Sequence, residues 1–198
     1  HYDYVAASLQ CVKGDLGRAM DVYADMLKHP TFPLDEIRTE RNRLLGEIRS
    51  RDDRPPTAAM KRFREQLLSP GPYGRPLEGD PTSVNSITQI DLVEAHHLIF
   101  RPENMVVAVV GDISFEDAKR MVERHFGDMI PVGEPVSEVS KNYIPQARRD
   151  RMVRDVEQGF VAMGTVTVPV SHDDSPAVDM ATAILGQGMS ARLFRELR

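Results

Sequence analysis

Glu40 and Glu47 are the residues of this chain whose type and spacing best suit metal chemistry. They lie in the segment ERNRLLGE, inside a longer helical pattern. At about 100° per residue, both project to one side of the helix, about 60 to 80° from the apolar stripe of Ile37, Leu44 and Ile48. We therefore expect both acids on one uninterrupted helix, near a sheet at the edge of the buried face and not in open solvent.

The spacing of the two glutamates leaves a second interpretation open. Arg41 and Arg43 lie between them, and carboxylates beside arginines on a helix edge commonly form solvated salt bridges. Oxygen and nitrogen donors have to converge from several residues before a carboxylate becomes part of a catalytic zinc site. Helical spacing alone does not choose between a metal ligand and a salt-bridged edge.

Histidines that could complete a zinc site are not grouped in this sequence. A catalytic zinc ion commonly takes two histidines and one carboxylate, with water at the fourth position. His96 and His97 are adjacent, so on a helix they point about 100° apart and cannot grip one ion together. We expect His96 at an interior boundary and His97 on the polar side. The sequence contains neither H-E-x-x-H nor H-x-x-E-H, so we predict no catalytic residue within this chain.

Cys11 is the single cysteine, which excludes an intrachain disulfide and a thiolate metal cluster. It lies in a β-like run, and we expect it to be a buried structural residue.

The composition excludes two broad classes of function. The net charge of −5 offers no basic excess for nucleic acid, and no apolar run approaches the ~20 residues that span a bilayer. The chain begins with His1 instead of Met and stops within a helical pattern, so we expect it to be a piece of a longer protein.

Hydrophobic periodicity predicts alternating helices and strands. The expected strands are residues 4–12, 104–112, 148–156 and 159–169. The expected helices are residues 15–30, 34–53, 57–68, 87–100, 114–128 and 175–187, with a further helix beginning within 188–198.

A change in composition divides the chain. Residues 131–146 are rich in Pro, Ser and Glu without periodicity, and we interpret them as an interdomain linker. Residues 1–130 would then be the C-terminal part of a first domain, and residues 147–198 the start of a second.

Four segments in a fixed order carry a family resemblance. They are residues 5–48, 72–88, 92–114 and 185–198. Together they cover essentially the whole chain, and they resemble the insulinase/pitrilysin family, which includes mitochondrial processing peptidases and many bacterial zinc proteases. The resemblance implies an α+β fold, with a mostly antiparallel sheet, helices packed on one side of it, and a second similar domain only begun.

The resemblance also implies roles for individual residues. In the family, H-x-x-E-H supplies two histidine ligands and a glutamate that activates water, and a segment of form E-R-x-x-x-x-x-E supplies the third ligand. The segment ERNRLLGE places that zinc ligand at Glu47 and a supporting acid at Glu40. The segment GQGMSARLFRELR is similar to one early in the family's second domain, which makes Arg192 a candidate substrate contact. A structural role for Ser190 and Arg192 at a helix start is the alternative.

The function implied is part of a zinc-dependent endopeptidase that acts on peptides or unstructured proteins. Because the histidine ligands and the catalytic glutamate are missing, we expect this chain alone to be inactive and to bind no zinc tightly, although zinc is the family's metal. The alternative is a non-catalytic subunit that binds peptide or scaffolds an active homologous partner. An unrelated α+β binding domain would require the four ordered segments to arise by chance. The expected location is the bacterial periplasm or cytoplasm.

Overall fold

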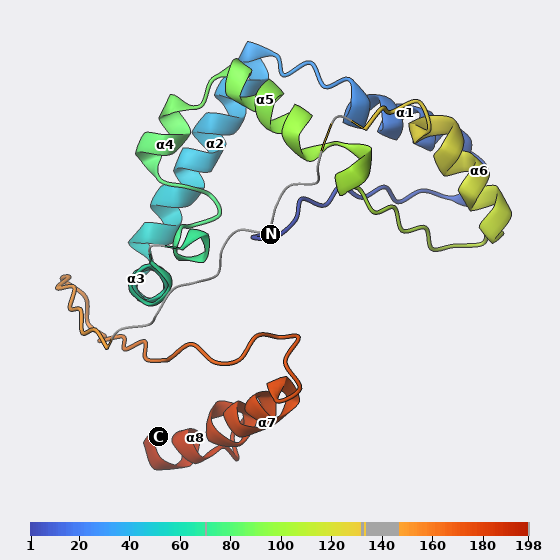
Figure 1. The fold of residues 1–198 in the computed structure, drawn as a ribbon. Helices are drawn as coiled ribbons and strands as arrows, with labels where there is room; N and C mark the ends of the chain where they lie inside the picture. Colours follow the sequence, from blue (N-terminus) through green and yellow to red (C-terminus); the bar gives the residue numbers. More distant parts are fainter. Residues whose placement is uncertain (70, 132, 134–146, 198) are drawn as a thin grey trace.

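The computed structural model describes residues 1–69, 71–131, 133 and 147–197, and helices dominate this part of the chain (Figure 1). The α-helices within it are α1 (Leu16–Lys28), α2 (Leu34–Asp53), α3 (Pro55–Leu68), α4 (Pro81–Ser86), α5 (Gln89–Ile99), α6 (Phe115–Phe126), α7 (Ser175–Gly186) and α8 (Arg192–Leu197). Short 3-10 turns are η1 (Lys13–Asp15), η2 (Pro72–Gly74) and η3 (Pro102–Asn104).

The longer helices form where the sequence predicts them. Helix α2 spans the whole predicted segment, and α3 begins at Pro55, which suits a first helical position because its missing N–H would have no partner there. Ser114 caps α6 by accepting a hydrogen bond from the backbone N–H of Asp117 at 3.1 Å.

Helix α4 was missed because it lies in a Pro/Gly-rich segment between the helices expected at residues 57–68 and 87–100. Asp80 caps it by accepting hydrogen bonds from the N–H groups of Thr82 and Ser83, and the Ser83 hydroxyl accepts from the Asp80 N–H. Pro81 occupies the first helical position. These are recognisable start signals for a helix, which the proline and glycine content of the loop obscured.

The packed part of the molecule is centred on α2, which lies against α3 and α4 (Figure 1). Ile48 of α2 is only 1% exposed, and Ala58 of α3 and Val84 of α4 are also buried. Arg41 of α2 donates to the backbone carbonyl oxygens of Val84, at 3.3 Å from Nε, and of Ile87, at 2.5 Å from Nη2. Apolar packing on one side of α2 and the hydrogen bonds of Arg41 therefore hold this helix against its neighbours.

A second pair of helices, α1 and α6, is joined largely by charged side chains. Lys28 donates to Asp128 at 2.6 Å, and His125 Nε2 lies 2.9 Å from the carboxylate of Asp21. Met20 and Ala24 of α1 supply the buried apolar surface.

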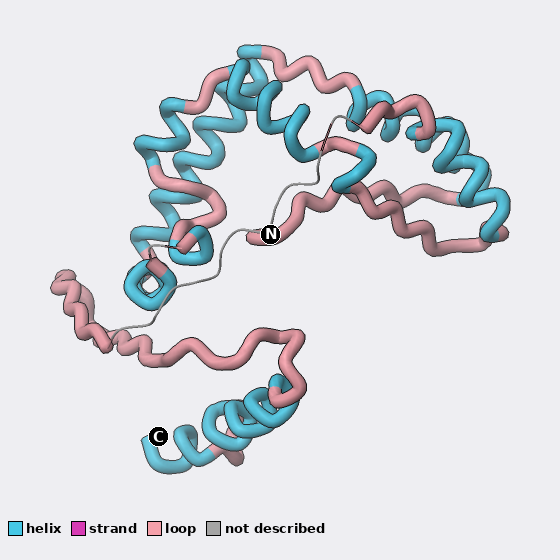
Figure 2. Tube along the Cα trace, in the orientation of Figure 1, coloured by secondary structure: helices cyan, strands magenta, loops and turns pink. Residues whose placement is uncertain are grey.

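The predicted α+β fold with a mostly antiparallel sheet is wrong for this structure. The described residues contain no β-strand, and Figure 2 shows the segments of the expected strands as loops. A strand exists only when a neighbouring strand pairs with its N–H and C=O groups. These apolar segments stay extended without such a partner, so Val106, Val110 and Val161 are 95%, 98% and 95% exposed.

Residues 147–170 run as an extended segment to α7 and α8, which pack on each other (Figure 1). The predicted linker, residues 131–146, lies outside the described residues except for 131 and 133, so the division into domains stays a prediction. The helices of the described residues are all too short or too polar to span a lipid bilayer.

Candidate functional site

Helix α2 is the element that positions the two candidate glutamates. Asp35 and Glu36 lie in its first turn, where negative charge favours the helix dipole, and Pro55 follows its end. Burial of Ile48 fixes the rotation of α2 against its neighbours. The side of the helix that carries Glu40 and Glu47 is thereby set.

Glu40 and Glu47 lie on one uninterrupted helix and point to the same side, as the helical period predicts. Arg43 bridges them: its Nε donates to Oε2 of Glu40 at 2.7 Å, and its Nη1 donates to Oε1 of Glu47 at 2.5 Å. The two glutamate side chains are 61% and 56% exposed, so the prediction that they avoid open solvent, close to a sheet, is wrong. The structure shows the salt-bridged edge that the sequence left open.

Electrostatics within this trio favour the charged form of the arginine. The hydrogen bond and the charge of Glu40, together with the charge of Glu47, raise the pKa of Arg43 above its ordinary value. The second oxygen of each carboxylate, Oε1 of Glu40 and Oε2 of Glu47, has no hydrogen-bond partner among the described residues. Each acid therefore has one oxygen available to a further cation.

A complete metal site is not formed by the part of the chain that the structure describes, where no three His, Cys, Asp or Glu side chains converge. His96 is partly buried, with Nε2 2.8 Å from the Leu27 carbonyl oxygen and its ring stacked on Phe100. His97 is exposed. Both histidines lie as the helical spacing predicts, and neither joins Glu47 in a ligand set.

Two other sequence candidates lie elsewhere. Cys11 is exposed, so the prediction of a buried cysteine is wrong: its extended segment has no partner strand to cover it. Arg192 begins α8 and is exposed, and α8 lies at the opposite end of the chain from α2 (Figure 1). The structure does not bring Arg192 to the glutamates, and its role as a substrate contact stays a prediction.

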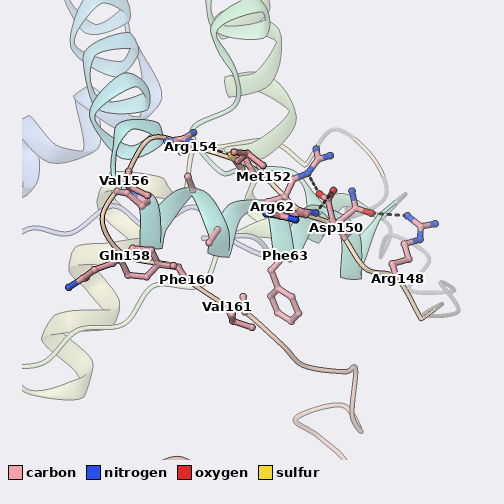
Figure 3. Close-up of a pocket in the computed structure, with 18 residues that line it drawn as sticks. Arg62, Phe63, Arg148, Asp150, Met152, Arg154, Val156, Gln158, Phe160 and Val161 are labelled. Carbon is pink, nitrogen blue, oxygen red and sulfur yellow. Dashed lines mark hydrogen bonds and ion pairs between the residues drawn. The ribbon is translucent and has the colours of Figure 1, made fainter. Parts of the chain in front are cut away.

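A groove that the sequence analysis missed lies between α3 and the extended residues 148–162 (Figure 3). It has a volume of about 540 Å³. Arg62 of α3 forms an ion pair with Asp150, and Arg148 reaches Gln66 at 3.4 Å. The signal for it was the basic run ARRDRMVRD, which overlaps the strand that we expected at residues 148–156.

The same run attaches the extended segment to the helical cluster. Arg154 Nη1 donates to the backbone carbonyl oxygen of Asp52 at 2.6 Å, at the end of α2. The hydrogen bond and charge of Arg62 lower the pKa of Asp150, against a smaller opposing effect of burial. In this structure Arg62, Arg148 and Arg154 of the groove thus bind acceptors from the chain itself.

Comparison with known proteins gives a consistent result. The family model described as the peptidase M16 inactive domain matches residues 86–198. An uncharacterized zinc protease of Mycobacterium leprae is 33% identical over 189 residues, which is 93% of this chain and 42% of that protein. The zinc protease PqqE of Helicobacter pylori is 25% identical, over 99% of this chain and 45% of that protein. The chain spans less than half the length of these curated relatives.

Solved structures share the path of the backbone. The peptidase M16 inactive domain from Pseudomonas fluorescens has a TM-score of 0.76 at 23% identity, over 94% of this chain and 45% of that one. A protease from Helicobacter pylori has a TM-score of 0.72 at 22% identity, over 94% of this chain and 46% of that one. At these identities the likeness shows the fold alone.

Proposed function

Because this chain belongs to the peptidase M16 (insulinase/pitrilysin) family, whose relatives named above are zinc proteases, we propose that it forms part of a zinc-dependent endopeptidase in which Glu47 is one metal ligand. The observation that supports this role is the Glu47 side chain itself: it lies on a rigid helix, is 56% exposed and keeps one carboxylate oxygen free of partners among the described residues. Oxygen from a glutamate is an established zinc donor.

Among the described residues, Glu47 would supply one of the zinc ligands, and the remaining ligands are not present beside it. Histidine ligands have to come from outside the described residues, since these hold no group of three donors. Zinc, when bound, would polarise the substrate carbonyl and acidify its water. Glu40 lies on the same side of the helix as Glu47, and the packing around Ile48 keeps both acids in register. This chain thus contributes one ligand and its support, and alone it is inactive.

A second function has a specific observation in its favour. The matching family model over residues 86–198 carries the description "inactive domain". This description favours a non-catalytic subunit that binds peptide or scaffolds an active homologue. The relatives named are bacterial proteins, which supports a bacterial periplasmic or cytoplasmic location.

Zinc content and peptide cleavage separate the two functions. We would measure both on the full-length protein, on Glu47→Gln, and on Glu36→Gln as a control that removes one exposed carboxylate from the first turn of α2. We expect Glu47→Gln to lose most bound zinc, by about 10-fold or more in affinity, together with cleavage of an unstructured peptide, while Glu36→Gln retains both.

Zinc-dependent cleavage that survives Glu47→Gln would show that Glu47 is not a ligand. A full-length protein that neither binds zinc nor cleaves peptide would place it in the non-catalytic class.

A further inference from the structure

Arg43 occupies the position between the two candidate acids. It lies three residues after Glu40 and four before Glu47, so all three side chains share one side of α2. Two different nitrogens of the guanidinium are used, Nε for Glu40 and Nη1 for Glu47. A planar fork of donors can bridge two carboxylates in this way, whereas a lysine ammonium offers a single point of charge.

The guanidinium of Arg43 already interacts with the carboxylate of Glu47 that an incoming metal ion would bind. A carboxylate that already accepts a hydrogen bond from a guanidinium presents less negative potential to a metal ion. We infer that Arg43 is a built-in competitor for the metal position on Glu47, so that it lowers the affinity of the site for a divalent cation. This inference depends on the proposed role of Glu47 and deepens it by assigning a regulator to the same site.

Competition outweighs any benefit that Arg43 gives by ordering Glu47. The helical period already places both acids on one side, so the backbone needs no arginine to bring them together. The rotamer that Arg43 stabilises directs Oε1 of Glu47 toward the guanidinium instead of toward an ion. Repulsion remains even when the ion binds the other oxygen, because the two positive charges then share one carboxylate.

The expected size follows from Coulomb's law in a solvated setting. The three side chains are 55 to 61% exposed, so a water-like dielectric and salt screening both apply. For a divalent ion about 5 Å from a guanidinium, these reduce the effect to a roughly 3- to 10-fold change in affinity at moderate ionic strength.

The test is the zinc affinity of the full-length protein, measured by competition with a chromophoric chelator for the wild type, Arg43→Gln and Arg49→Gln. Arg49 is an exposed arginine of the same helix, two residues from Glu47 and therefore about 200° away around the helix, and its substitution makes the same change in net charge. We expect Arg43→Gln to bind zinc about 3- to 10-fold more tightly than the wild type, and Arg49→Gln to stay within about 2-fold. The gain of Arg43→Gln should shrink at 0.5 M salt to about half or less on a logarithmic scale, since exposed charges are then screened.

Equal or weaker zinc binding by Arg43→Gln would overturn the inference and would mean that the arginine is neutral to the site or organises it. The Glu47→Gln variant keeps the two proposals apart. Loss of zinc in Glu47→Gln with no gain in Arg43→Gln rejects only the competitor. Unchanged zinc affinity in Glu47→Gln, or zinc binding by no variant, rejects the proposed ligand and the competitor with it.

Discussion

The helical cluster of α2, α3 and α4 and the extended segments differ in how their backbones are satisfied. In the cluster, each helix pairs its own N–H and C=O groups, and side chains such as Asp80 cap the ends. The extended residues 4–12, 104–112 and 148–169 have no strand partner within the described chain. Ile48 in the cluster is 1% exposed, whereas Val110 in an extended segment is 98% exposed.

This difference shows that a helix can form from the residues of its own segment, whereas a strand depends on a second segment elsewhere in the chain. A helix needs only its own residues to close its hydrogen bonds, and packing then adds stability. A strand needs a second segment in the right register, and its apolar side chains stay in water without one. The candidate metal site lies on the self-sufficient type of element, so Glu40 and Glu47 keep their relation to each other whatever the extended segments do.

The largest expected difference between the helical cluster and the extended segments is in the effect of a substitution at Ile48 on stability. Ile48→Ala removes a buried side chain between packed helices, and we expect it to lower the free energy of unfolding by about 2 to 4 kcal/mol. The matched substitution Val110→Ala should change it by less than about 0.5 kcal/mol, because that side chain already lies in water. Urea denaturation of the 198-residue chain, followed by far-ultraviolet circular dichroism, measures both.

A cost above about 1 kcal/mol for Val110→Ala would contradict the contrast, since it would mean that the extended segment is packed in solution.

Sequence reasoning succeeded where the signal is local. The boundaries of α2 were predicted to the residue, and the common side of Glu40 and Glu47 follows from the helical period alone. Helix α4 could have been found from Asp80 followed by Pro81. The bridge made by Arg43 was also within reach, because residues three and four apart on a helix are neighbours.

The failures share a non-local cause. The expected strands and the burial of Cys11 were both inferred from β-like runs, which state a preference but cannot supply a partner, and the sheet was expected from the family resemblance. Glu40 and Glu47 are exposed because no sheet lies beside α2 in the described residues to cover them. The groove between α3 and residues 148–162 joins segments nearly a hundred residues apart, and no periodicity reports such a contact.

Limited proteolysis sharpens the comparison at the level of the backbone. Trypsin should cleave first after Arg148, Arg151 or Arg154, because an extended, exposed segment fits a protease without unfolding. Cleavage after Arg38 or Arg49, which are exposed but helical, requires local opening of α2 and should be slower by about 10-fold or more. Mass spectrometry of early time points gives the order. Equal early cleavage within α2 would show that the helical cluster opens as readily as the extended segments.

The smallest expected effect concerns the charged end of the cluster, where Asp52 accepts hydrogen bonds from Lys61 Nζ at 2.9 Å and Arg51 Nε at 3.3 Å. Burial raises the pKa of Asp52, but the hydrogen bonds and charges of Lys61 and Arg51 outweigh it and leave that pKa below its ordinary value. A carboxyl whose pKa is lowered by folding stabilises the protein above its unfolded pKa of about 3.9 and loses this contribution as the pH falls through its folded value. Since the Asp52 side chain is 33% exposed, we expect Asp52→Asn to cost about 0.5 to 1 kcal/mol at pH 7 and to converge with the wild type as the pH falls below about 4.

The neighbouring substitution Asp53→Asn is the control for this last prediction. Asp53 is exposed at the same helix end, and its replacement by Asn removes the same charge. Its effect should be near zero or slightly stabilising, since a negative charge at a helix C-terminus opposes the dipole. Denaturation curves for both variants at pH 7, 5 and 3 separate the ion pairs of Asp52 from this general effect. If the two variants behave alike at every pH, the contact of Asp52 with Lys61 contributes nothing to joining α2 and α3, and its contact with Arg51 adds nothing to the end of α2. The stability of the cluster would then come from its apolar packing around Ile48 and from its helix caps.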